Sequence, residues 1–122
     1  MIHSVAISEM VGTHYFSPLK GDFKTCIDQA AQIGYEGVEI HVRNPFAVDF
    51  NELHDYALSK GVSITSIGTG MACGYDGHYF TNPDALARKE CQRVFKESAD
   101  NRVLHRAGSK NQLTIVSYFS PI

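Results

Sequence analysis

The segment Gly37-Val38-Glu39-Ile40-His41-Val42-Arg43 carries the clearest structural signal in this sequence. From its second residue onward, apolar and charged residues alternate without a break. Such alternation is typical of a β-strand, in which successive side chains point to opposite faces of a sheet. The segment therefore predicts a strand with an apolar face and a face that carries Glu39, His41 and Arg43.

Strand and helix patterns recur on both sides of this segment. Apolar runs over residues 2–10 and 62–67 predict the neighbouring strands. Amphipathic helices are predicted over 22–34 and 49–61, because an aspartate that can cap a helix begins each range and a glycine ends it. The alternation predicts an α/β chain whose strands are parallel and joined by βαβ connections.

The C-terminal third continues this series less regularly. Asn82-Pro83 predicts the start of a helix that reaches about Asp100, and residues 113–119 have the β-branched and aromatic content of a fourth strand. We find no linker, so residues 1–122 are predicted to form a single domain. The competing fold is a small flavodoxin-like domain, which would need a phosphate-binding loop where the poorly matching segment 11–15 stands.

Composition excludes several classes of function. Eleven basic residues against thirteen acidic ones, with no Lys/Arg run, disfavour nucleic acid and membrane surfaces as partners. No stretch reaches the roughly 18 apolar residues of a membrane span, and the N-terminal residues lack the pattern of a secretory signal. Three cysteines without CxxC spacing argue against a disulfide framework or a zinc knot. We expect a soluble, cytoplasmic protein.

The charged face of the strand at 37–43 holds the main candidates for chemistry. A carboxylate and an imidazole can share general acid/base work, so Glu39 and His41 are candidate catalytic residues that move a proton or bind a sugar hydroxyl or a metal. Arg43 on the same face is a candidate for substrate binding. The alternatives are the exposed face of an open sheet, or a buried glutamate paired with an arginine.

Further candidates follow the third predicted strand. Gly68 and Thr69 begin a Gly-Thr-Gly segment in which small residues allow backbone N–H groups to approach a phosphate or hydroxyl, although a tight turn with unusual backbone angles is the alternative. His78 lies in the loop beyond and is a candidate substrate contact or a solvated surface residue. Arg88, in the third helix, would bind a phosphate or pair with Asp84.

Several of these sequence segments together resemble a known family. The run Glu36-Gly37-Val38-Glu39-Ile40-His41-Val42-Arg43-Asn44-Pro45 is similar to the second strand of the xylose isomerase-like barrels, the sugar-phosphate isomerase/epimerase family. Residues 64–70 resemble its third βα unit, together with the residues that follow them: Tyr75-Asp76-Gly77, Thr81, Asp84 and Arg88. Residues 6–9 fit its first strand. The order of the units agrees as well as their local sequence.

The resemblance implies that the chain forms the N-terminal half of a TIM barrel. It covers about residues 2–96, whereas the stretch 101–122 does not continue the family pattern. A complete barrel takes about 250 residues, roughly twice the number present. We therefore expect a truncated or frame-shifted member, and a half-barrel whose unpaired strand edges favour a homo-oligomer that completes the sheet.

The family also implies a reaction. Its members interconvert aldose and ketose sugars or epimerise a carbon beside a carbonyl, by proton transfer commonly assisted by a divalent metal. A sugar or sugar phosphate is then the expected substrate, with Glu39, His41 and Thr69 on the substrate side. The family's usual metal ligands lie on later strands, so no metal ligand is assigned. A noncatalytic remnant that binds a small polyol or phosphate is the alternative; an abasic-site nuclease fits the acidic balance poorly.

Overall fold

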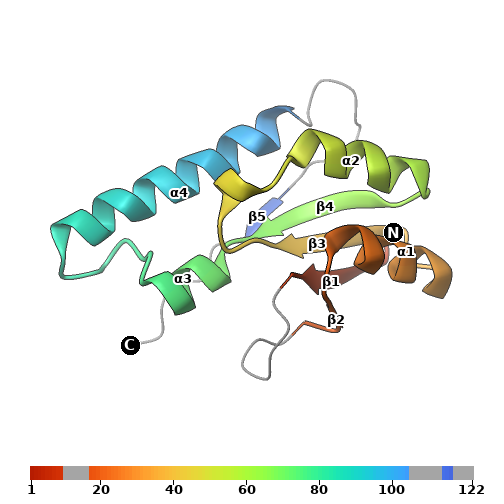
Figure 1. Cartoon of the computed structure of the whole chain (residues 1–122), viewed down its shortest axis with the longest axis horizontal. Coiled ribbons are helices and arrows are strands. Elements are labelled where there is room, and N and C mark those ends of the chain that lie inside the picture. Colours follow the sequence, from red (N-terminus) through yellow and green to blue (C-terminus); the bar gives the residue numbers. More distant parts are fainter. Residues whose placement is uncertain (10–16, 105–113, 117–122) are drawn as a thin grey trace.

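The structure is a computed structural model that describes residues 1–9, 17–104 and 114–116 (Figure 1). Its elements, in chain order, are β1 (Ser4–Ser8), β2 (Leu19–Lys20), α1 (Phe23–Ile33), β3 (Gly37–His41), the 3-10 helix η1 (Pro45–Ala47), α2 (Phe50–Ser59), β4 (Ser63–Gly68), α3 (Gly70–Asp76), α4 (Ala85–Leu104) and β5 (Thr114–Val116).

The strands form one parallel sheet in the order β2-β1-β3-β4-β5. Apart from the two-residue β2, neighbouring strands follow one another in chain order, with β3 and β4 at the centre. Helices α1 and α2 contact each other as well as the sheet, so they cover the same face, and α4 contacts β5 and η1 (Figure 1). The predicted parallel α/β class is confirmed. A doubly wound flavodoxin-like domain would place helices on both faces.

The core lies between this helical layer and the sheet. Ile7, Ile40 and Ile67 stand side by side on adjacent strands and are fully buried. Helix α1 covers them with Phe23, Cys26, Ile27 and Ala30. The helical pattern also places Ile33 on this apolar face, but Ile33 stands at the end of the helix and is exposed. Removal of this apolar surface from water is the main source of stability in a domain of this size.

The predicted helix ends are confirmed in detail. The carboxylate of Asp22 accepts a hydrogen bond from the Thr25 N–H at 3.0 Å, and Asp49 caps α2 in the same way through Glu52. Gly34 ends α1 with φ of 103°, a conformation that glycine adopts without steric cost. These local signals fix where α1 and α2 begin, and therefore how β3 enters the sheet.

Two elements were not expected. Leu19 and Lys20 lie in the segment 17–21, whose serine, proline and glycine are typical of a turn. They pair with Ile7 and Ser8 at the edge of β1, and two residues are too few to show a periodicity. Residues 70–76, predicted as loop, form α3. The strand predicted over 113–119 is confirmed at 114–116, and its remaining residues lie outside the described part. Across the described residues, no helix is both long and apolar enough to cross a membrane.

Candidate functional site

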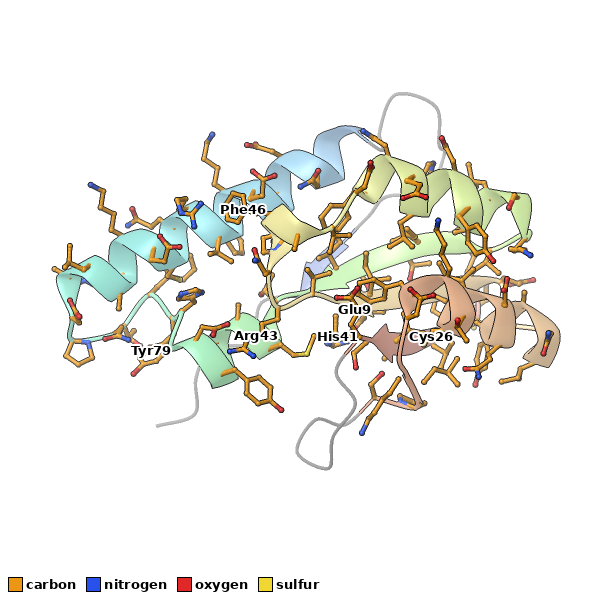
Figure 2. All side chains as sticks on the ribbon, in the orientation of Figure 1. Glu9, Cys26, His41, Arg43, Phe46 and Tyr79 are labelled. Carbon is orange, nitrogen blue, oxygen red and sulfur yellow. The ribbon has the colours of Figure 1, made fainter. Side chains whose placement is uncertain are left out.

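A carboxylate, an imidazole and a hydroxyl meet on the face of the sheet opposite α1 and α2. The imidazole is that of His41, labelled in Figure 2. Oε1 of Glu39 lies 2.6 Å from Nε2 of His41, and Oε2 accepts a hydrogen bond from the Ser66 hydroxyl at 2.8 Å. The side chain of His41 is 5% exposed and that of Glu39 26%. The two predicted catalytic residues therefore touch each other, with part of the carboxylate still open to a ligand.

A bulge in β4 determines which hydroxyl lies beside the Glu39 carboxylate. Val38 pairs with Ile64, but the next residue of β3, Glu39, pairs with Ser66, so that Thr65 is an additional residue in β4. Without this shift, Thr65 would stand beside the carboxylate. Bulges re-aim side chains in this way and are common near functional sites.

Gly68 makes room for the imidazole. A Cβ at Gly68 would lie 2.6 Å from Nδ1 of His41, closer than any real contact of that kind. Gly68 ends β4, Gly70 begins α3, and neither has a positive φ, so the alternative of a strained tight turn is wrong. The close approach at this segment is to the His41 ring, whereas contact of Gly68 and Thr69 with a ligand stays a prediction.

Ser8 is a polar residue of this face that the sequence did not single out. It pairs with His41 in the register of the sheet and is fully buried. Its hydroxyl has no hydrogen-bond partner among the described residues. The signal that could have found it is the alternation within β1, which places Ser4, Ala6 and Ser8 on the face of Glu39 and His41.

Arg43 does not pair with Glu39, so the alternative of a buried Glu–Arg pair is wrong. Its guanidinium binds the carboxylate of Asp76 through two hydrogen bonds, from Nε at 2.9 Å and from Nη2 at 2.6 Å, and lies 5.2 Å from the ring centre of Tyr75. The hydrogen bonds from Arg43 hold the pKa of Asp76 below its usual value. The carboxylate of Glu39 is thereby left to His41 and Ser66.

A cleft of about 360 Å³ opens beside Arg43, between η1, α3 and α4. It brings together two predicted substrate-binding residues, Arg43 and His78, with two residues that the sequence did not indicate, Glu90 and Arg93. Arg93 binds Glu90 through Nε and Nη2, and these hydrogen bonds lower the pKa of Glu90. The volume of the cleft is within the range of small-molecule sites.

Arg88 does not line this cleft. Its Nη1 donates hydrogen bonds to the carbonyl oxygens of Asn82 at 2.7 Å and Pro83 at 3.0 Å, which ties the start of α4 to the preceding loop. Its predicted salt bridge with Asp84 is not among the ion pairs of the described residues. A role for Arg88 in substrate binding stays a prediction.

No three His, Cys, Asp or Glu side chains of the described residues are grouped so that they could hold a metal ion. The divalent metal implied by the resemblance therefore does not fit the described part of the chain, and the chemistry of the Glu39–His41 pair is considered without it. No family model matches the sequence, and no curated protein matches it either. The functional assignment therefore depends on the geometry of these side chains.

Proposed function

We propose that this chain is a half-barrel of the sugar-phosphate isomerase/epimerase type, in which the Glu39–His41 pair transfers a proton at the carbon beside a sugar carbonyl. The observation that carries the proposal is the 2.6 Å contact between Glu39 Oε1 and His41 Nε2 on the polar face of the sheet. A partly exposed carboxylate in contact with a nearly buried imidazole suits a general base and its proton partner.

The proton transfer uses groups that are all present on this face. The Glu39 carboxylate removes a proton from the carbon beside the carbonyl, and the C–H electron pair forms the C=C bond of an enediolate. Return of the proton to the former carbonyl carbon, with transfer of the hydroxyl proton to the former carbonyl oxygen, gives the isomeric sugar. Protonation of the first carbon from the opposite side, by water, gives the epimer, and the proton held by Glu39 then passes to solvent. His41 holds the carboxylate in place and exchanges protons with it, and Ser66 fixes its second oxygen.

Three features support the half-barrel. The strands β1, β3, β4 and β5 follow one another in chain order, as the first four strands of a barrel do. Helices α1 and α2 share one face, and ionisable groups lie on the other, where a barrel interior would be. Within the described residues, the sheet ends at β2 and β5, and these edges would let a second copy of the chain complete the barrel. Three cysteines without a disulfide support a cytoplasmic location.

Exchange of substrate hydrogen with solvent tests the proposal. The purified chain would be incubated in D2O with aldoses, ketoses and their phosphates, with and without divalent metal, and deuterium at the carbon beside the carbonyl followed by NMR. We expect incorporation by the wild type and loss in Glu39→Gln and His41→Ala. Glu36→Gln is the matched control, because Glu36 is exposed and lies outside the site. Equal incorporation in wild type and Glu39→Gln would remove Glu39 from the mechanism.

The alternative is a noncatalytic module that binds a small polyol or phosphate. The cleft beside Arg43 favours it, because binding there needs no chemistry from Glu39. Ligand binding without deuterium incorporation, in a chain that light scattering shows to be a monomer, would support this alternative. A discrete dimer that incorporates deuterium would support the half-barrel enzyme.

A further inference from the structure

We propose that the cleft between η1, α3 and α4 binds an oxyanion group, a carboxylate or a phosphate, of a small ligand through the guanidinium groups of Arg43 and Arg93. The sequence pointed to Arg88 of α4 as a candidate for phosphate binding, but not to Arg93. Assigning this group to the substrate rests on the proposed function, but the binding itself does not require turnover.

The two guanidinium groups have unused donors. Arg43 and Arg93 each use only the edge formed by Nε and Nη2 to bind a carboxylate, that of Asp76 and that of Glu90. No described residue accepts a hydrogen bond from Nη1 of either arginine. Each therefore keeps N–H donors of the kind that bind carboxylates and phosphates strongly. A ligand rich in hydrogen-bond acceptors matches this surplus better than a neutral polyol does.

Both guanidinium groups are also held in place while remaining accessible. That of Arg43 lies over the ring of Tyr75, and that of Arg93 lies 4.1 Å from the ring centre of Phe46. Their side chains are 44% and 56% exposed. Because the carboxylate and the ring fix each guanidinium before a ligand arrives, binding loses less side-chain entropy than it would at a free arginine.

His78 completes the cleft. The arginines are the main cause of the lowered pKa values of Asp76 and Glu90, and an electrostatic interaction with His78 is a smaller cause of both, so the imidazole lies near both carboxylates. Its Nδ1 is buried and has no hydrogen-bond partner among the described residues.

The balance of charges limits the affinity. The carboxylates of Asp76 and Glu90 offset the two arginines, so the cleft does not attract anions by net charge and binds through directed hydrogen bonds. We therefore expect dissociation constants in the millimolar range, which correspond to about 4 kcal/mol.

Three probes that share one sugar ring test the inference: glucuronate, glucose 6-phosphate and glucose. Their dissociation constants would be measured by NMR titration of the full chain at constant ionic strength, because salt screens exposed charges. We expect at least one of the two anions to bind about tenfold more tightly than glucose, since hydrogen bonds to charged groups are worth more than neutral ones. The anion that binds identifies the group as a carboxylate or a phosphate.

Variants of α4 separate the forked guanidinium from simple positive charge. Arg93→Ala should weaken anion binding about tenfold, and Arg93→Lys, which keeps the charge but loses the fork, should also weaken it. Lys96→Ala is the matched control: Lys96 lies on the same helix, is 79% exposed and pairs with Asp100 outside the cleft. Chemical shifts of core methyl groups would confirm that each variant is folded.

The inference is overturned if glucose binds as tightly as both anions, if none of the probes binds, or if Lys96→Ala weakens binding as much as Arg93→Ala. Glu39→Gln separates it from the proposed function. Loss of deuterium incorporation with unchanged anion binding in this variant supports both proposals. Anion binding that depends on Arg93 in a chain without any turnover supports the cleft alone.

Discussion

The two faces of β3 are built from alternate residues of one strand, yet they serve different purposes. On the helical side, Val38 and Ile40 are completely buried in a continuous apolar layer. On the other side, the Glu39 carboxylate contacts His41 and accepts a hydrogen bond from Ser66, and the Glu39 side chain remains partly exposed. The helical face therefore supplies stability through buried apolar side chains. The polar face instead groups ionisable side chains, an arrangement that stability alone does not require.

The largest effect should come from the apolar face. Ile40→Ala removes a side chain that is fully buried between Ile7 and Ile67, and we expect a loss of about 2–5 kcal/mol in the free energy of unfolding. Urea denaturation followed by circular dichroism would measure it. Ile33→Ala is the control, because Ile33 is 65% exposed at the end of α1 and should cost little. Equal losses in both variants would contradict the assigned core.

A smaller effect is expected where the polar face is tightly packed. Gly68→Ala places a Cβ against the His41 ring, so the imidazole must move away from Glu39 at a cost of about 1–3 kcal/mol. The ring resonances of His41 in NMR spectra should shift accordingly. In Gly74→Ala, the control, the new Cβ meets nothing within 4 Å inside α3, so stability should rise slightly. An unmoved His41 in Gly68→Ala would argue against this packing.

Loss of the charge on the polar face should change stability less than either of these substitutions. Glu39→Gln keeps the shape of the side chain and one acceptor for Ser66 or His41, so we expect a change of about 1 kcal/mol or less in the free energy of unfolding. The same variant should lose deuterium incorporation. Calorimetry and the exchange assay on one sample would show whether stability and chemistry separate. A loss as large as that of Ile40→Ala would make Glu39 a structural residue.

The smallest change in stability is expected where the polar face meets the cleft. Arg43 lowers the pKa of Asp76, so Arg43→Ala should raise that pKa toward its usual value. A carboxyl group with a lowered folded-state pKa adds stability above its unfolded pKa, near 3.9, and loses it as the pH falls through the folded value. The wild type should therefore exceed Arg43→Ala by about 1 kcal/mol or less at neutral pH and lose this margin in acid.

NMR titration of the Asp76 carboxyl carbon in both proteins would measure this shift directly. Lys96→Ala removes a positive charge from α4 that pairs with Asp100 and not with Asp76, so it should leave the titration of Asp76 unchanged. An identical Asp76 pKa in wild type and Arg43→Ala would mean that the two side chains are not paired in solution.

The sequence predicts the elements well where the signal is local. Alternation in β3 places Glu39 and His41 on one face, and the caps at Asp22 and Asp49 locate the helices to within a residue or two. These predictions succeed because side-chain direction and capping depend on neighbours within a few positions.

The site is predicted only in part, because its remaining contacts are not local. Arg43 and Asp76 are 33 positions apart, and Ser66 reaches Glu39 only through the register shift in β4. Arg93 on α4 lines the cleft because α4 packs against η1, and no sequence pattern predicts this packing. Gly68 is predicted to let the backbone approach a ligand or to form a tight turn, whereas in the structure it leaves space for the His41 ring, which comes from another strand.

One further consequence follows from Gly37. The hydroxyls of Ser4 on β1 and Thr65 on β4 lie 3.0 Å apart, although β3 runs between their strands. In a flat sheet those strands would be about 9.6 Å apart, farther than two such short side chains reach. A Cβ at Gly37 would collide with both residues. The sheet must therefore curl around Gly37, with its hollow side toward Glu39 and His41, so that further strands added in the same sense would bend toward a closed cylinder.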